Sequence, residues 1–295
     1  MDEALFSYEE YTLKDSVKFN METRITRPKG EYCKTGYRDF DKLTGGFRSA
    51  ELTIIAGRPA MGKTSFVLNC VRHLVLANEN KVGLFMARER SEKLVNMLLA
   101  METHTDIKHI ETGALDSKEM GMINEAAELL GSADILATYP INYLCKFDLE
   151  ELYNYFCEFV FGYGVQIIFV DSLQNIDVEG VSDPKERYVE IVKTLRDAAI
   201  FLGIPIVLIS SLTDKLEQRE DKKPKEADLR EYGPIDRYAD TIAFLYNDEY
   251  YDRDSEIKGI TNIAIAKNIS GHTGEIDLFW LPQYFTYCNL EKGHD

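Results

Sequence analysis

Eight residues near the start of the chain have the types and spacing of a phosphate-binding loop. The segment from Gly57 to Thr64 reads Gly-Arg-Pro-Ala-Met-Gly-Lys-Thr and fits G-x-x-x-x-G-K-[ST] at every fixed position. In such a loop the backbone N–H groups surround phosphate oxygens, the lysine reaches the β- and γ-phosphates, and the final hydroxyl binds Mg²⁺. The pattern therefore predicts an ATP site. The residues expected to bind the nucleotide are Gly57, Arg58, Gly62, Lys63, Thr64 and Ser65.

An aspartate that follows an apolar run predicts the second half of the same site. Phe169 and Val170 directly precede Asp171. If this run is a buried strand, the carboxylate lies at the carboxyl end of the sheet, where α/β proteins bind their ligands. A carboxylate at this place supports Mg²⁺ in P-loop proteins. Thr64 and Asp171 are thus the expected metal-binding residues, and Lys63 and Asp171 are expected to act in catalysis.

Strand and helix patterns alternate from about residue 51, and these elements must position the two segments. Apolar and β-branched runs predict strands at 52–56, 82–86, 135–137, 165–170 and 204–209. Helical patterns lie between them at 62–77, 92–102, 117–130, 148–161 and 184–202. Four further strands are predicted at 241–246, 260–267, 274–281 and 284–289. This order predicts a three-layer α/β domain with a mostly parallel central sheet and a β-rich C-terminal end.

Composition limits the class of protein. The chain has 295 residues, a formal net charge of −16 and no apolar stretch near the ~20 residues of a membrane span. Its five cysteines form no C-x-x-C pair, which excludes a zinc ribbon and indicates reduced thiols in the cytoplasm. The polar residues 1–33 are predicted to be an N-terminal arm, and residues 34–295 an ATPase domain. No secretory signal is expected.

Several motifs occur in an order that is typical of one family. Over roughly residues 34–289 the chain resembles the C-terminal, RecA-like motor domain of DnaB-type replicative helicases. The matching segments are Thr35–Gly46, Arg58–Thr64, Asp171–Gln174, Leu216–Arg219 and Asp228–Gly233. The resemblance implies a RecA-like P-loop fold, a homo-oligomeric hexameric ring with ATP and Mg²⁺ between subunits, and single-stranded DNA in the central channel. It also implies contacts with other replication proteins, an arm that docks on the neighbouring subunit, and a Lys267 that reaches the neighbour's γ-phosphate.

Three positions depart from this family where its members hold catalytic groups. Arg88, with Glu89 beside it, replaces the glutamate that orients water, Ser211 replaces a glutamine that senses the γ-phosphate, and Ile269 replaces the arginine finger. A finger accounts for roughly 10³ or more in rate. The sequence therefore leaves two functions open. One is an ATP-dependent helicase motor, and the other is an ATP-binding regulatory or structural relative, such as a loader or a non-catalytic ring subunit.

The segment 213–225 is the candidate nucleic-acid interface. It holds five basic residues against four acidic ones. Basic side chains along a groove can follow a phosphate backbone, although a solvated loop of mixed charge has the same composition. The residues expected to contact single-stranded DNA are Lys215, Arg219, Lys222 and Lys223. A second charged segment, 246–256, has five carboxylates and one arginine, and is predicted to be a solvated surface loop.

Overall fold

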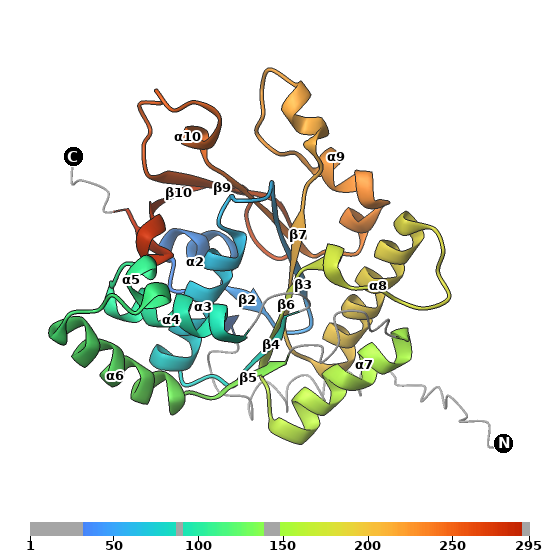
Figure 1. The fold of residues 1–295 in the computed structure, drawn as a ribbon. Coiled ribbons are helices and arrows are strands. Elements are labelled where there is room, and N and C mark those ends of the chain that lie inside the picture. The colour runs from blue at the N-terminus through green and yellow to red at the C-terminus, as the bar shows by residue number, and fades with distance from the viewer. Residues whose placement is uncertain (1–31, 87–90, 139–147, 291–295) are drawn as a thin grey trace. The chain divides into compact units, whose positions relative to one another are not determined.

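Nine strands of the described residues form one central sheet (Figure 1). The computed structural model describes residues 32–86, 91–138 and 148–290. The strands are β3 (Leu52–Gly57), β4 (Val82–Met86), β5 (Ile135–Thr138), β6 (Ile167–Asp171), β7 (Ile206–Ser211), β8 (Thr241–Tyr246), β9 (Ile260–Asn268), β10 (Gly274–Leu281) and β11 (Thr286–Asn289). Their order across the sheet is β11-β10-β9-β8-β3-β7-β6-β4-β5. The strands from β8 to β5 run parallel, as the sequence predicted for most of the sheet. The predicted β-rich C-terminal end, β8 to β11, is antiparallel.

Helices cover both faces of this sheet (Figure 1). On one face lie α3 (Lys63–Ala77) and α4 (Ser91–Thr103), and on the other lie α7 (Leu149–Cys157) and α8 (Pro184–Leu202). Each face has its own hydrophobic core, because successive side chains of a strand point to opposite faces. In β3, Ile55 packs in the core that holds Phe66 of α3. Ile54 packs in the core that holds Leu195 of α8. The three-layer prediction is therefore confirmed.

Shorter elements connect and extend the layers. Tyr32–Cys33 (β1) pairs with Phe47–Arg48 (β2) in a separate two-stranded sheet. The remaining α-helices are α2 (Arg38–Thr44), α5 (Ile107–Thr112), α6 (Ser117–Gly131), α9 (Glu226–Leu229) and α10 (Asp248–Tyr251). The 3₁₀ turns are η2 (Leu173–Asn175), η3 (Asp214–Gln218), η4 (Arg230–Tyr232), η5 (Ile235–Arg237) and η6 (Pro282–Tyr284). No helix in the described ranges is long and apolar enough to cross a bilayer.

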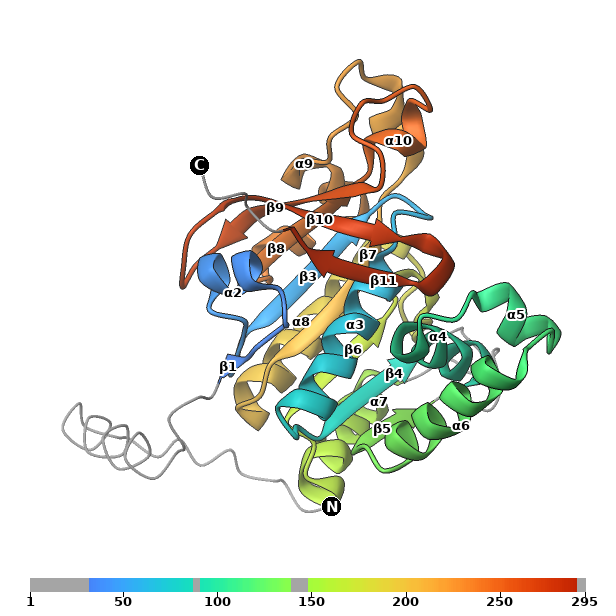
Figure 2. The same cartoon turned by 90° about the vertical axis from the view of Figure 1, so that its left-hand side faces the viewer.

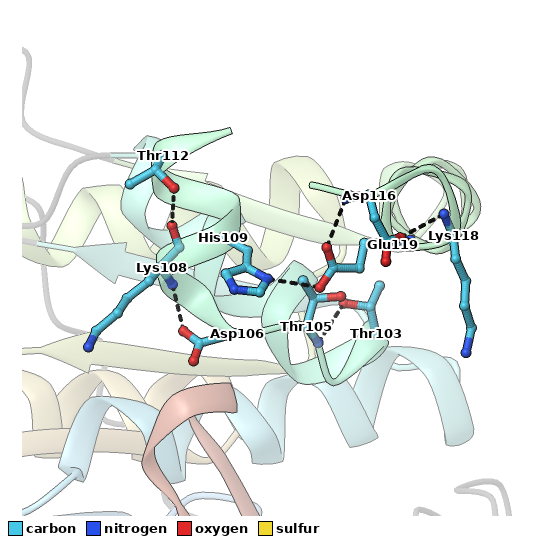
Figure 3. Close-up of polar contacts among 9 residues, drawn as sticks. All are labelled: Thr103, Thr105, Asp106, Lys108, His109, Thr112, Asp116, Lys118 and Glu119. Atoms are coloured by element: carbon cyan, nitrogen blue, oxygen red, sulfur yellow. Dashed lines mark hydrogen bonds and ion pairs between the residues drawn. The ribbon is translucent and has the colours of Figure 1, made fainter. Parts of the chain in front are cut away.

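The helices α5 and α6 extend the layer beside α4 (Figure 2), and side-chain caps hold their ends (Figure 3). The Asp106 carboxylate accepts a hydrogen bond from the Lys108 N–H at 2.8 Å. Asp116 and Glu119 form a capping box at the start of α6, with the Asp116 N–H donating to Glu119 at 3.0 Å. The His109 ring lies 2.9 Å from Glu119 and joins the two helices. The helix α5 is six residues long and buries no residue, so its apolar pattern is too short to identify a helix, and the sequence did not predict it.

Several predicted elements end or begin elsewhere. The strands predicted at 165–170 and 204–209 lie one or two residues further along, as β6 and β7. The helix predicted to continue to residue 161 is α-helical only to Cys157 and goes on as a π-helix, η1 (Glu158–Gly162). There the Phe159 ring fills the space above Gly83 of β4, where a Cβ would lie 2.6 Å from it. The last strand begins at Thr286 instead of residue 284, because η6 precedes it and Phe285 has a φ of +50°.

Residues 246–256 lie largely at the surface, as predicted, but they do not form a simple loop. The segment contains α10, and the buried Ser255 hydroxyl donates to the Asp248 carboxylate at 2.6 Å. The rings of Tyr246 and Tyr251 stack with their centroids 5.7 Å apart. These aromatic contacts hold the segment against β8, and a count of its charges could not show them.

Candidate nucleotide site

The loop between β3 and α3 requires glycine at two of its positions. Gly62 has a φ of +76°, and a Cβ on it would lie 2.2 Å from the Tyr287 hydroxyl. At Gly57 a Cβ would lie 2.8 Å from the backbone oxygen of Leu245. Glycine alone combines the left-handed conformation with this close approach at no steric cost. The loop is thus supported from behind by β8 and β11, two elements of the antiparallel end.

Lys63 places its ammonium group inside the loop. Its Nζ donates to the backbone oxygen of Arg58 at 2.9 Å, and the residue is only 7% exposed. Burial lowers the pKa of Lys63 to about 8, although the Asp171 carboxylate acts in the opposite direction. Because a bound phosphate would favour the charged form, the loop holds a cation that gains from an anionic ligand. Lys63, Thr64 and Ser65 form the first turn of α3, whose N–H groups point towards a ligand at the helix start.

Thr64 and Asp171 meet at the carboxyl edge of the sheet. The Thr64 hydroxyl donates to Asp171 Oδ2 at 2.6 Å. Asp171 is the last residue of β6 and pairs with Met86, the last residue of β4. Among the described residues there is no group of three or more His, Cys, Asp or Glu side chains that could hold a metal. The pair nevertheless fits Mg²⁺, which in phosphate sites takes one or two protein oxygens and completes its shell with phosphate and water.

Arg58 directs its side chain away from the loop interior. Its Nε donates to Glu217 Oε1 at 2.7 Å, and one terminal nitrogen donates to the Leu212 backbone oxygen at 2.7 Å. Both partners follow β7. The sequence had assigned Arg58 to nucleotide contact, whereas the guanidinium lies against the segment after β7.

The residues that replace family catalytic groups lie in different places in the structure. Ser211 pairs with Gly57 in the β3–β7 register, so it lies beside the first residue of the loop, and its N–H donates to Gln174 at 2.8 Å. Ile269 follows β9 and is 61% exposed. Arg88 and Glu89 lie outside the residues that the structure describes.

Lys267 does not lie at the chain's own loop. It pairs with Ile242, which pairs with Ile54, three residues before Gly57. With a rise of about 3.3 Å per residue, Lys267 is displaced along the sheet by roughly 10 Å towards the amino ends of the parallel strands. Its Nζ donates to the Asp236 backbone oxygen at 2.8 Å. A role for Lys267 in phosphate chemistry therefore requires the site of another copy.

The four candidate DNA-binding residues lie on one segment but already have partners within the chain. Arg219 makes a bidentate pair with Asp228, at 2.9 and 3.0 Å. Lys222 lies over the Tyr251 ring, 5.1 Å from its centroid. The other contacts are Lys215 with Glu231 and Lys223 with Glu275. Their binding to DNA stays a prediction, and a nucleic acid would have to compete with these contacts.

Three residues of the site had no role in the sequence analysis. Glu217 and Gln174 lie in motifs that carried the family resemblance, and the motifs alone do not say what each side chain touches. Gln174 Nε2 donates to the Ser210 hydroxyl at 3.0 Å and so joins the ends of β6 and β7. Tyr287, which donates to the Met61 backbone oxygen at 3.3 Å, lies more than two hundred residues further along the chain and had no sequence signal.

The geometry defines a RecA-like P-loop domain, and comparisons with known proteins agree. A family model described as the DnaB-like helicase C terminal domain matches residues 33–289. Among curated proteins, the replicative DNA helicase DnaB of Geobacillus stearothermophilus is 32% identical over 270 residues, covering 88% of this chain and 57% of that protein. The replicative DNA helicase DnaC of Bacillus subtilis (strain 168) is 33% identical with the same coverage.

Solved structures show the same fold. One of them, described as an ATPase domain, superposes with a TM-score of 0.86 at 25% identity, covering 96% of this chain and all of that one. A DnaB-like replicative helicase, solved in a study of its interactions with primase, gives a TM-score of 0.83 at 24% identity, covering 96% of this chain and 68% of that one. The chain belongs to the DnaB-like helicase C-terminal domain family. It spans about 57% of the length of the curated relatives it matches.

Proposed function

We propose that this chain binds Mg-ATP at the loop between β3 and α3 and is the motor domain of a replicative DNA helicase. The observation that carries the proposal is the 2.6 Å contact between Thr64 and Asp171, beside the buried ammonium group of Lys63. A hydroxyl, a carboxylate and a lysine in this order are the protein groups of a P-loop Mg-nucleotide site.

Each residue has a defined task in this proposal. Lys63 neutralises charge on the β- and γ-phosphates, and the N–H groups of the first turn of α3 bind phosphate oxygens. Thr64 and Asp171 hold Mg²⁺, which when bound supplies charge compensation on the phosphates. Gly57 and Gly62 let the loop pack closely against Leu245 of β8 and Tyr287 of β11, which support it from behind. These groups bind and orient the nucleotide.

A ring is the proposed assembly, with residues 1–33 as the arm and 34–295 as the ATPase domain. Lys267 supports this, because it is displaced from the chain's own P-loop. The phosphate role that the family resemblance implies for it would therefore be towards a neighbouring copy. A hexamer, single-stranded DNA as the bound polymer and contacts with other replication proteins are proposed by analogy with the family. For one relative, interactions with primase are on record.

Calorimetry with Mg-ATP tests nucleotide binding, with Lys63→Ala as the comparison. The variant is expected to bind at least tenfold more weakly, since charge-assisted hydrogen bonds are worth about 1.5–3 kcal/mol. Light scattering with nucleotide tests the ring, and unwinding of a forked duplex tests the motor. Failure of the parent protein to bind Mg-ATP would remove the basis of the proposal.

A second function is favoured by two specific positions. Ser211 beside Gly57 is too short to reach far over the loop, and Ile269 has no charge to offer a neighbour. A chain with these residues is suited to bind ATP and join a ring while turning over slowly, as a regulatory or structural subunit. Steady-state ATP turnover with and without single-stranded DNA separates the two functions.

A further inference from the structure

The start of the P-loop and the segment that follows β7 are joined by backbone and side-chain contacts. The Leu212 N–H donates a hydrogen bond to the Gly57 backbone oxygen at 3.0 Å, and the Arg58 guanidinium donates one to the Leu212 backbone oxygen at 2.7 Å. Arg58 also donates to Glu217, and their side chains are only 16% and 34% exposed. Any displacement of the backbone at Arg58 therefore acts directly on residues 212–217.

The 3₁₀ turn η3 connects Glu217, the partner of Arg58, with the basic residues of the same segment. Leu216 in its middle is 2% exposed and anchors the turn in the core that contains α8. Lys215, two residues before Glu217, pairs with Glu231 of η4. Arg219, two residues after Glu217, pairs with Asp228 of α9. The turn is thus bonded to the P-loop on one side and to α9 and η4 on the other.

We propose that Arg58 and Glu217 are positioning residues that couple occupancy of the P-loop to the order of residues 212–225, the segment that carries the basic side chains. A nucleotide fixes the loop and with it Arg58. Arg58 then holds Glu217, and η3 transmits this restraint to Arg219 and the residues beyond. The inference deepens the proposed function and rests on it only for the binding of a nucleotide at the P-loop.

The coupling between the P-loop and residues 212–225 rests on a short chain of strong contacts. The Arg58–Glu217 bond joins two ionised groups, and such bonds are roughly twice as strong as neutral ones. Coupling between sites needs an element whose equilibrium both sites bias. The segment from Thr213 to Lys225 has that character, because Leu216 is its one buried apolar residue, while Arg219 pairs with Asp228 of α9 and Lys225 pairs with Asp221 inside the segment.

Limited trypsinolysis measures this order directly, because the segment contains cleavable bonds after Arg219, Lys222 and Lys225. Cleavage is followed by mass spectrometry at these bonds, with and without a non-hydrolysable ATP analogue and Mg²⁺. In the parent protein the analogue is expected to slow cleavage about fivefold or more, the lower end of typical coupling factors. In Glu217→Ala the analogue is expected to change the rate by less than about twofold, because the link to Arg58 is gone.

Glu190→Ala is the matched control. Glu190 is also 34% exposed and pairs with a cation, Lys193, but it lies on α8, and this variant is expected to keep the full response to nucleotide. Glu217→Gln keeps the shape and removes the charge, and is expected to give an intermediate factor.

Three results overturn the inference: no protection in the parent although calorimetry shows binding, an unchanged protection factor in Glu217→Ala, or loss of the factor in the control. A purely structural role for Glu217 would raise cleavage equally with and without nucleotide and leave the factor intact. Failure of the parent to bind the analogue would instead contradict the proposed function.

Discussion

Thr64 and Asp171 are 107 positions apart in the chain, yet their side-chain oxygens lie 2.6 Å apart. One is the second residue of α3, and the other is the last residue of β6. Because parallel strands end at the same edge of the sheet, two ordinary sequence motifs converge there. This contact is the most direct structural support for a Mg-nucleotide site in the chain.

Asp171→Asn is expected to weaken binding of ATP in the presence of Mg²⁺ by about tenfold or more, since the metal loses a charged oxygen ligand worth about 1.5–3 kcal/mol. Binding of ATP with EDTA is expected to change little. Calorimetry with and without Mg²⁺ measures both. Asp197→Asn, at an exposed position of α8, is the control. An unchanged Mg²⁺ dependence in Asp171→Asn would show that the metal is held elsewhere.

The affinity for ATP is expected to depend on pH through Lys63. Burial lowers the pKa of Lys63 to about 8 in the free protein, and a bound phosphate favours the ammonium form, so binding raises that pKa. The contribution of Lys63 is therefore fully present below pH 8 and declines as the pH rises above it, by up to about tenfold per pH unit. Titrations from about pH 7 to about pH 9.5 should show this decline, together with uptake of a proton from the buffer. Lys63→Ala should bind weakly with a flatter profile.

Gly62→Ala is expected to lower both stability and ATP affinity. The substitution places a Cβ 2.2 Å from the Tyr287 hydroxyl at a residue whose φ is +76°. A left-handed conformation alone costs an L-residue roughly 1–2 kcal/mol. Gly121→Ala is the opposite case, because Gly121 lies within α6 with no atom near its virtual Cβ, and alanine there is expected to stabilise by about 0.5–1 kcal/mol. Thermal melting of the two variants compares them directly. If both variants melt alike, Tyr287 moves to admit the methyl group.

The predicted fold agrees with the structure where the local pattern and the tertiary environment demand the same residues. The strands Val82–Met86 and Gly274–Leu281 and the helix Pro184–Leu202 have the predicted bounds. Asp183 caps that helix through a bond from the Glu186 N–H at 2.8 Å. These elements carry apolar runs or cap residues that are strong signals on their own.

The remaining features depend on contacts between distant residues, which a single sequence does not contain. The Arg58–Glu217 hydrogen bond joins positions 159 apart in the chain, and nothing in the sequence around either residue indicates its partner. The pairing of Lys215, Arg219 and Lys223 with acidic partners could not be foreseen from their charges. The short elements α2, α5, α9 and α10 are one or two turns long, so periodicity over a longer window cannot detect them.

If the chain has the second function, that of a subunit that binds ATP and turns it over slowly, it is expected to hydrolyse ATP at least ~10³-fold more slowly than an active motor, because the arginine finger is missing. Hydrolysis needs a group that orients water, a set of groups that bind the phosphates and Mg²⁺ (the phosphate cradle), and positive charge from the neighbouring subunit. The cradle is built by Lys63, Thr64 and Asp171, whereas Ile269 offers an exposed apolar side chain in place of a charge.

Ile269→Arg, alone and with Ser211→Gln, is therefore expected to raise turnover in the assembled protein, with the larger gain in the double variant. Dilution below the assembly concentration should abolish the gain from Ile269→Arg, because that charge acts on a neighbour's nucleotide. Ile257→Arg, another exposed isoleucine at 55%, controls for the added charge. Steady-state phosphate release with and without single-stranded DNA measures all four proteins. Rapid turnover by the parent would show that another group replaces the finger, and a gain that survives dilution would place the Ile269 position at the chain's own nucleotide.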